Sequence, residues 1–147
     1  MKKMLVFFAI TMFSASLFAQ EAVPVKKAEE LVKFKDLTYN FGKIKKGVPV
    51  THDFVFTNVS DKPIVIETAT PSCGCTTPVW PQAPVGKGKA DKITAGFNAQ
   101  SIGPFNKTIA VKLAGVDGVV TITITGDVLD TEEYVKYEKA KNSKGKK

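Results

Sequence analysis

The chain has 147 residues, with 21 basic residues against 14 acidic ones, and its formal net charge is +7. These totals alone would suggest a nucleic-acid-binding protein. The distribution of charge argues against that class, because two lysines lie in the first three residues and five lie in the last nine. Removing these seven charges leaves a net charge of zero for residues 20–138. The length is that of one domain, which excludes a two-domain cofactor enzyme.

Residues 1–19 have the layout of a secretory signal peptide. Two lysines precede an apolar run from Met4 to Phe13, and small and apolar residues continue to Ala19. The run is too short for a permanent membrane span, so we expect cleavage after Ala19 rather than a retained anchor. No cysteine at the cleavage point offers a site for a lipid, and no later run is long and apolar enough to cross a membrane. We therefore expect a periplasmic or secreted protein, in a compartment where disulfides persist.

Residues 20–33 show no sustained hydrophobic period, and we interpret them as a linker. Across residues 34–129, short runs alternate apolar and polar residues between turns rich in glycine, proline, asparagine and aspartate. This pattern is typical of antiparallel sheets. An early strand is expected over residues 34–41. About seven strands over about 95 residues predict an all-β, immunoglobulin-like antiparallel β-sandwich.

The clearest strand is Val50–Asn58, which places His52 on the same face as the large apolar residues Phe54 and Phe56. Turn residues follow, and the next strand, residues 64–68, is expected to form a hairpin with it. Further alternating runs lie within residues 93–97, 105–113 and 120–124. The turn Ala114–Gly118 between the last two predicts a second hairpin.

Residues 130–147 form a lysine-rich tail. Asp130 followed by Glu133 is a plausible helix cap with an acidic first turn, and Thr131–Lys141 can form a short helix. An isolated helix of this length is marginal in water, so disorder is expected from Asn142 onward.

Both cysteines of the chain lie in one loop, with Cys73 and Cys75 separated only by Gly74. Glycine makes the bend of such a small ring accessible. Three interpretations stay open: a local structural disulfide, a copper or zinc site formed by two thiolates, and a redox-active pair. The metal site would need a further ligand, and His52, a methionine or a partner chain could supply it. A pair that is simply reduced is the fourth possibility.

The loop around the cysteines is also the predicted partner-binding surface, with Ser72, Gly74, Thr76 and Trp80 as its candidate residues. Trp80 can pack over the sandwich edge or stand as an exposed aromatic anchor, and packing is favoured. For His52, the only histidine, a hydrogen-bonded and partly buried side chain is favoured over an acid–base or ligand role.

Other chemistry finds little support in the sequence. The segment Gly86–Lys89 lacks the spacing and the following helix of a phosphate loop. No serine sits in a nucleophile elbow, and one histidine cannot supply a metal triad, so hydrolytic catalysis is not expected. Two triplets that begin at Asn58 and Asn106 match the glycosylation pattern, and so short a match carries little weight.

Several segments together carry a family resemblance. In chain order they are Phe41–Ile44, Gly47, His52–Asn58, Pro63–Ile66, Cys73–Thr76 and Gly126–Val128. Over about residues 34–129 the chain resembles the bacterial domain of unknown function 1573 family, with a Cys-Gly-Cys-Thr signature. The resemblance implies an exported immunoglobulin-like sandwich, akin to domains of periplasmic chaperones and cilia-associated proteins. It implies no established activity. The segment Val79–Lys89 is less regular than this pattern.

The leading hypothesis is an exported, non-enzymatic binding or structural module of the bacterial cell envelope without a cofactor. Its partner would be an envelope protein or a glycan, not nucleic acid, bound through loops or a sheet edge near the Cys-Gly-Cys loop. The alternative is a metal-handling protein for copper or zinc, or a thiol-redox protein, that acts through Cys73 and Cys75 with His52 as a possible ligand.

Overall fold

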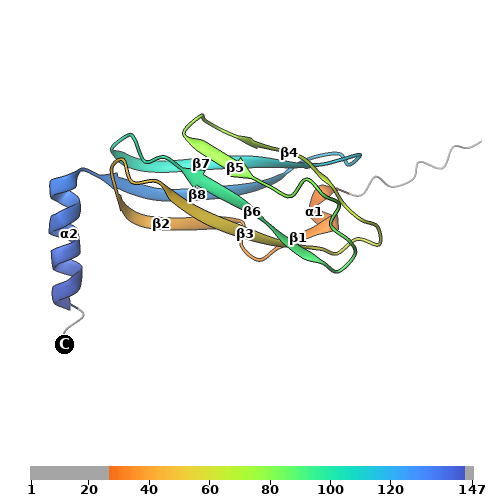
Figure 1. Cartoon of the computed structure of the whole chain (residues 1–147), viewed down its shortest axis with the longest axis horizontal. Coiled ribbons are helices and arrows are strands. Elements are labelled where there is room, and N and C mark those ends of the chain that lie inside the picture. Colours follow the sequence, from red (N-terminus) through yellow and green to blue (C-terminus); the bar gives the residue numbers. More distant parts are fainter. Residues whose placement is uncertain (1–26, 145–147) are drawn as a thin grey trace, which may run out of the picture.

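The computed structural model describes residues 27–144 and shows two four-stranded sheets packed face to face, with a helix at each end of the described chain (Figure 1). The expected signal peptide and the first part of the expected linker lie outside the described residues. The elements are α1 (Ala28–Leu31), β1 (Val32–Phe34), β2 (Thr38–Lys45), β3 (Val50–Asn58), β4 (Ile66–Pro71), β5 (Thr76–Val79), β6 (Ala90–Phe97), β7 (Gly103–Leu113), β8 (Val120–Leu129) and α2 (Thr131–Lys144).

The strand order identifies an immunoglobulin-like sandwich, as the sequence predicted. One sheet has the order β1-β3-β6-β5 and the other the order β2-β8-β7-β4. If β1 and β2 are read as the two halves of the first strand, this is the ABED and GFC arrangement of that fold. Residues 27–144 contain eight strands rather than about seven, and one pairing, β2 with β8, is parallel.

One of the two predicted hairpins is present. Strands β7 and β8 pair antiparallel from Gly103 with Val128 to Val111 with Val120, across the predicted turn. The hairpin expected from β3 and the following strand is wrong, because β3 pairs with β1 and β6, whereas β4 pairs with β7 in the opposite sheet. The connection after β3 therefore crosses the sandwich. Alternation marks the buried face of a strand, but it does not identify the neighbouring strand.

The sandwich domain begins earlier than the expected boundary at residue 34. Ala28–Leu31 is helical and Val32–Phe34 pairs with β3, so residues 28–33 of the expected linker belong to the sandwich. The single early strand expected over residues 34–41 is two strands. The chain pairs with β3 as β1, changes sheets over residues 35–37, and continues beside β8 as β2.

The core lies between the two sheets and is filled by the inward faces of the alternating strands. Phe97 and Phe105 stack across it with ring centroids 4.1 Å apart. The largest fully buried apolar side chains are those of Phe54, Phe56, Ile93, Ile109, Val111, Leu113, Ile122, Ile124 and Val128. Most of these residues occupy alternate positions within the predicted strands, which is the pattern expected for a strand with one buried face.

A buried asparagine joins two loops at one end of the sandwich, the β3–β4 connection and the β5–β6 connection. The Asn58 side chain is 0% exposed, and its Nδ2 donates to the carbonyl oxygens of Lys62 and Val85, both at 2.8 Å. Its Oδ1 accepts from the backbone N–H and the hydroxyl of Ser60, at 2.9 and 2.7 Å. The main chain of Asn58 also bonds to Gly88 and Lys89. The glycosylation triplet at this position is therefore a structural feature, because a buried amide is not accessible to modification.

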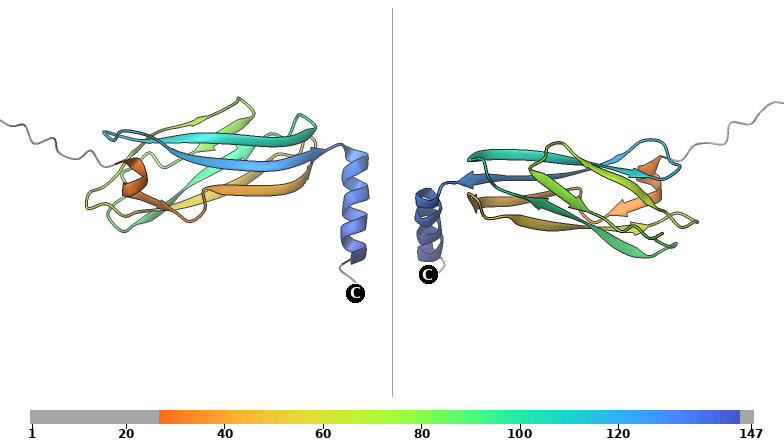
Figure 2. Two further views of the ribbon diagram at one scale, coloured as in Figure 1. Left: turned by 180° about the vertical axis from the view of Figure 1, so that it is seen from behind. Right: turned by 45° about the horizontal axis from the view of Figure 1, so that its top comes forward.

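Helix α2 begins as the sequence predicted. The backbone N–H of Glu133 donates to the Asp130 carboxylate at 2.9 Å, which is an N-terminal cap. The helix continues to Lys144, so the disorder expected from Asn142 is not seen over residues 142–144. It stands across the end of the sandwich where β8 ends (Figure 2). Neither helix in the described part of the chain has the length and apolar composition needed to cross a membrane.

Candidate functional site

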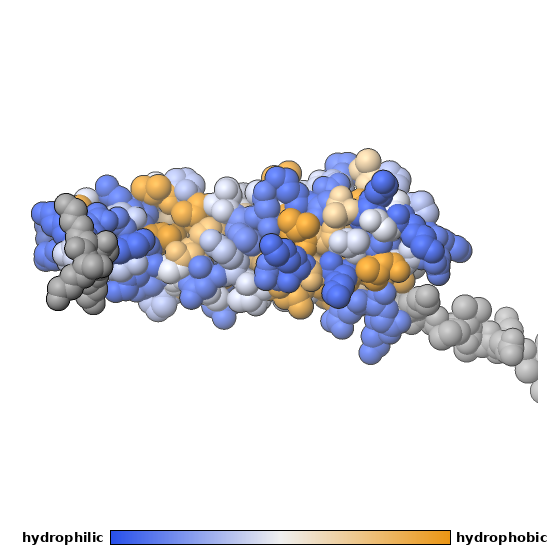
Figure 3. Space-filling model, turned by 90° about the horizontal axis from the view of Figure 1, so that it is seen from below, coloured by the Kyte–Doolittle hydropathy of each residue, from blue (hydrophilic) through white to orange (hydrophobic). Residues whose placement is uncertain are grey.

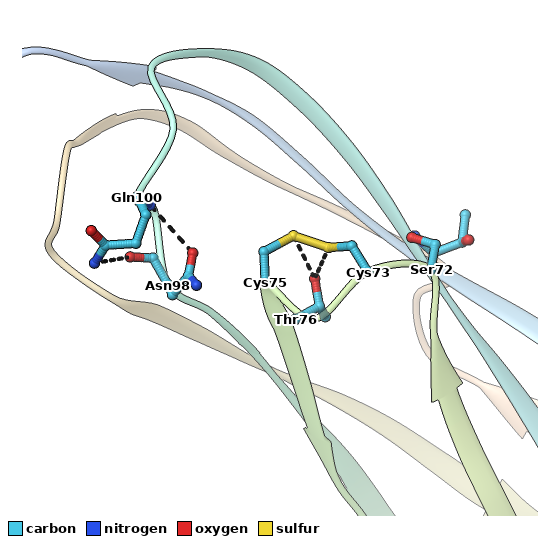
Figure 4. The surroundings of a disulfide bond; sticks show 7 residues. Ser72, Cys73, Cys75, Thr76, Asn98 and Gln100 are labelled. Atoms are coloured by element: carbon cyan, nitrogen blue, oxygen red, sulfur yellow. Dashed lines mark hydrogen bonds between the residues drawn. A yellow bond between two sulfur atoms is a disulfide. The ribbon is translucent and has the colours of Figure 1, made fainter.

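The two cysteines form a disulfide in the loop that joins β4 of one sheet to β5 of the other (Figure 4). Their Cα atoms lie 5.3 Å apart, within the usual range for a disulfide. Both residues are half-buried, while Ser72 and Gly74 beside them are exposed. Of the interpretations left open above, the structure has the pair in the disulfide state. Neither sulfur is then a thiolate that could bind a metal.

Backbone hydrogen bonds hold both sides of this loop. Before the cysteines, the N–H of Ser72 donates to the Thr108 carbonyl oxygen at 2.8 Å, and the N–H of Thr108 donates to the Ser72 hydroxyl at 3.1 Å. Ser72 is therefore exposed to solvent and also attaches the loop to β7.

After the cysteines, the loop is attached to the end of β6. The N–H of Asn98 donates to the Cys75 carbonyl oxygen at 3.1 Å, and the N–H of Thr76 donates to the Cys73 carbonyl oxygen at 3.2 Å. The Thr76 side chain is only 2% exposed, and its Oγ1 lies 3.7 Å from Cys73 Sγ and 4.0 Å from Cys75 Sγ. Thr76 supports the disulfide from inside and is not a contact surface.

Two further turns lie at the same end. The N–H of Gly47 in the β2–β3 turn donates to the Ala99 carbonyl oxygen in the β6–β7 loop at 2.8 Å. Exposed aliphatic side chains mark both segments, with Val48 49% and Ile102 55% exposed. We call these three connections, residues 46–49, 72–75 and 98–102, the disulfide end. The sequence pattern does not mark Val48 or Ile102 as site residues, because an aliphatic residue in a turn carries no chemical motif.

The backbone of the disulfide end is strained at one buried position. Ala99 has φ +53°, in the left-handed region, and its side chain is 0% exposed. A non-glycine residue in this region costs about 1 kcal/mol or more, and such residues persist only where the surrounding structure holds them. Gln100 turns back on the same loop, its N–H donating to Asn98 Oδ1 at 3.2 Å. The bonded turns therefore present a fixed surface.

The sheet edges next to the disulfide offer few backbone donors. Because Cys75 bonds to Asn98, the alternation of an antiparallel pair turns the backbone of Thr76 and Pro78 away from β6. The Thr76 N–H is already bonded to Cys73, and Pro78 has none. On β4, Pro71 likewise faces outward without an N–H. These edges have the features that prevent pairing with another strand.

His52 lies away from the cysteines. It pairs with Ala95, which pairs in turn with Pro78, so two strand spacings, about 10 Å, separate the backbones of His52 and β5. The His52 ring stacks on Tyr39 with centroids 3.6 Å apart and meets Phe54 edge-on at 4.8 Å. It is therefore partly buried among aromatic rings, and the proposed three-ligand metal site with Cys73 and Cys75 is not assembled.

The electrostatic surroundings of His52 favour the neutral ring. Burial lowers the pKa of His52, and the carboxylates of Asp36 and Asp53 oppose this only in part. In the described part of the chain, no group of three histidine, cysteine, aspartate or glutamate residues is placed to hold a metal ion.

Trp80 packs against the core and is half-buried, so it is not a free anchor. Its Nε1 is buried without a hydrogen-bond partner among the described residues. Of the four predicted loop residues, Ser72 and Gly74 are exposed, Trp80 is half-buried and Thr76 is buried.

Comparisons with known proteins agree with this fold. The model of the family described as "Protein of unknown function (DUF1573)" matches residues 32–128. No curated protein matches the chain. Among solved structures, the ASH/PapD-like domain 7 of human CEP192 is 10% identical, with a TM-score of 0.59 and coverage of 83% of this chain and 99% of that domain.

Two larger proteins contain a similar domain. A protein of unknown function from Porphyromonas gingivalis W83 is 12% identical with a TM-score of 0.57, covering 66% of this chain and 46% of that one. The VesB protease of Vibrio cholerae is 17% identical with a TM-score of 0.53, covering 69% of this chain and 33% of that one. The chain thus spans less than half of either protein, and at these identities the likeness shows the fold alone.

Proposed function

The chain belongs to the DUF1573 family, whose match covers about two thirds of its length, and we propose that it is an exported, non-enzymatic binding module of the bacterial cell envelope. The partner, an envelope protein or a glycan, would be bound through the disulfide end. The Cys73–Cys75 disulfide supports export, because such bonds persist in oxidising compartments.

The observation that carries the proposal is the fixed backbone of the disulfide end. Three connections from different parts of the sequence are joined by the hydrogen bonds of Gly47 to Ala99 and of Asn98 to Cys75. A surface that is ordered before binding loses less conformational entropy when a partner binds. The neighbouring edges of β4 and β5 offer few donors, so loop contact is favoured over the addition of a partner strand.

Photo-cross-linking in the native envelope tests the proposal. A photoreactive amino acid would replace Val48 or Ile102 at the disulfide end, and Val119, 44% exposed at the other end, would serve as the matched control. We expect the same envelope component to be joined to positions 48 and 102 but not to 119. Identical products at all three positions, or products at 119 alone, would refute contact through the disulfide end.

The alternative of thiol–disulfide exchange or metal handling depends on the same two residues. The pair is a disulfide whose two cysteines are half-buried beside exposed Ser72 and Gly74, and a disulfide favours thiol–disulfide exchange over metal binding. Mass spectrometry of the native protein before and after alkylation separates the cases. A pair that stays fully oxidised and carries no metal would eliminate this alternative.

A further inference from the structure

The outward face of the β2-β8-β7-β4 sheet carries an array of uncharged, mostly hydroxyl-bearing side chains. The strand registers align them in rows across the sheet, since Thr38 pairs with Thr123 and Thr123 pairs with Thr108. They point outward because the intervening residues of β8, Ile122 and Ile124, are fully buried. A further row lies on either side of this one. We define the neutral face as the eight residues of the three rows, Thr38, Thr70, Asn106, Thr108, Ala110, Thr121, Thr123 and Thr125.

The neutral face is open to solvent. Four of its residues are exposed and the other four are half-buried. The view from behind shows the outer surface of this sheet with no described helix or loop lying across it (left view of Figure 2). The narrow side of the molecule, seen from below, has a different surface, on which strongly hydrophilic residues alternate with hydrophobic patches (Figure 3). A uniform neutral composition is therefore a property of this face and not of the surface as a whole.

The polar side chains of the neutral face are not used within the domain. Among residues 27–144, none of them donates or accepts a side-chain hydrogen bond. The outward face of the other sheet differs, because Thr94 Oγ1 and Lys92 Nζ both donate to the Asp53 carboxylate at 2.6 Å. Threonine therefore serves an internal ion-pair network on one sheet, whereas on the other its hydroxyl groups remain available to a ligand.

Charged residues border the neutral face without entering it. At one border Lys112 follows Ala110 on β7 and forms an ion pair with Glu67 at 3.3 Å. At the other border Asp127 lies opposite Lys43 on the neighbouring strand. Because each border has one charge of each sign, the face offers no excess charge to a charged ligand.

We propose that the neutral face binds a neutral polysaccharide, at a site separate from the disulfide end. A threonine hydroxyl both donates and accepts hydrogen bonds and rotates to suit its partner, so it complements sugar hydroxyl groups, which do the same. The branched Cβ restricts χ1 of threonine, which holds these oxygens in place before a ligand arrives. Since the face and the ligand are both uncharged, no ion loses its hydration on binding.

The size of the neutral face favours a repeating ligand over a second copy of this chain. Strands about 4.8 Å apart and rows about 6.7 Å apart give the array an area of roughly 400 Å². A stable interface between proteins needs about 800 Å² from each partner. A polysaccharide presents the same groups at every unit, so that weak contacts at successive rows reinforce one another. Nucleic acid is disfavoured because no basic side chain of the face could bind its phosphates.

Retention on insoluble polysaccharides tests the proposal. The purified protein would be mixed with cellulose or chitin, which are neutral, and with alginate or chitosan beads, which carry negative and positive charge. Each mixture is measured at about 0.1 M and about 1 M salt, because salt screens contacts between charges but not those between neutral groups.

Three variants identify the surface. The test variant removes three hydroxyl groups and keeps the β-branched shape, with Thr108→Val, Thr123→Val and Thr125→Val. The matched control makes the same change on the outward face of the other sheet, with Thr51→Val, Thr57→Val and Thr77→Val. A third variant keeps the hydroxyl groups of the neutral face, with serine at positions 108, 123 and 125. Thermal unfolding confirms that each variant is folded.

We expect retention on a neutral polysaccharide at both salt concentrations. The test variant should bind about 100-fold more weakly, at about fivefold for each lost hydrogen bond, while the control and the serine variant stay close to the unmodified protein. Equal binding by the test variant, an equal loss in the control, or a serine variant as weak as the valine variant would overturn the proposal. Retention on the charged polymers alone, or on none, would also overturn it. So would a dimer in sedimentation that the test variant abolishes, because a second copy would then occupy the face.

Discussion

Replacement of Asn58 by alanine should destabilise the protein more than any surface change of the same size. The substitution removes two donated and two accepted side-chain hydrogen bonds, three of them buried. A buried group left without its partner costs about 1 to 3 kcal/mol. If water replaces some of these bonds, the free energy of unfolding should fall by about 3 to 5 kcal/mol, a large part of the stability of a small domain.

Urea unfolding followed by the fluorescence of Trp80, the only tryptophan, measures this change. At about 4 °C per kcal/mol for a domain of this size, the melting temperature should fall by about 15 °C. Asn106→Ala is the matched control, because Asn106 lies exposed on β7, and it should change stability by about 0.5 kcal/mol or less. A loss below about 1 kcal/mol for Asn58→Ala would refute the reasoning that this side chain joins the two loops.

Three further predictions concern pH, packing and the disulfide. Because burial lowers the pKa of His52, the unfolded chain binds the proton more readily, so stability is complete above about pH 6.5 and falls as the pH drops below it. His52→Phe should flatten the pH dependence of urea midpoints between about pH 5 and 8, and parallel curves would contradict this. A Cβ at Gly126 would lie 2.7 Å from Phe105 ring atoms, so Gly126→Ala should cost about 1 to 3 kcal/mol in thermal unfolding; an unchanged melting temperature would show that the ring moves freely. Replacing both Cys73 and Cys75 by serine should cost only about 1.6 kcal/mol, as expected for a three-residue loop, and a loss of folding would disprove a purely local role.

The local parts of the fold could be predicted because neighbouring residues determine them. Alternation in Val50–Asn58 identified the buried face of β3, and the turn Ala114–Gly118 identified the β7–β8 hairpin. The cap formed by Asp130 needs only a residue three positions further on. Each of these features depends on contacts within a few residues, so a single sequence is sufficient to predict it.

The candidate site could be predicted only in part. The Cys-Gly-Cys loop stands out because its two reactive residues are adjacent in the chain. The partners that give it a fixed shape, Asn98 and Thr108, lie more than 20 residues away and carry no motif. Exposed Val48 and Ile102 became candidates only when the turns that carry them were seen together.

The sequence by itself determined the all-β domain, the cysteine pair in one loop and the charged tail, because composition and short-range pattern encode such features. Tertiary structure decided which strands are neighbours, since the connection after β3 crosses between sheets and nothing in its composition distinguishes that path from a hairpin. It also decided where charge gathers. Net charge is a sum over the chain, but the field at a surface depends on distance, and only the contact of Lys43 with Tyr137 places the lysines at the end of β2 beside those of α2.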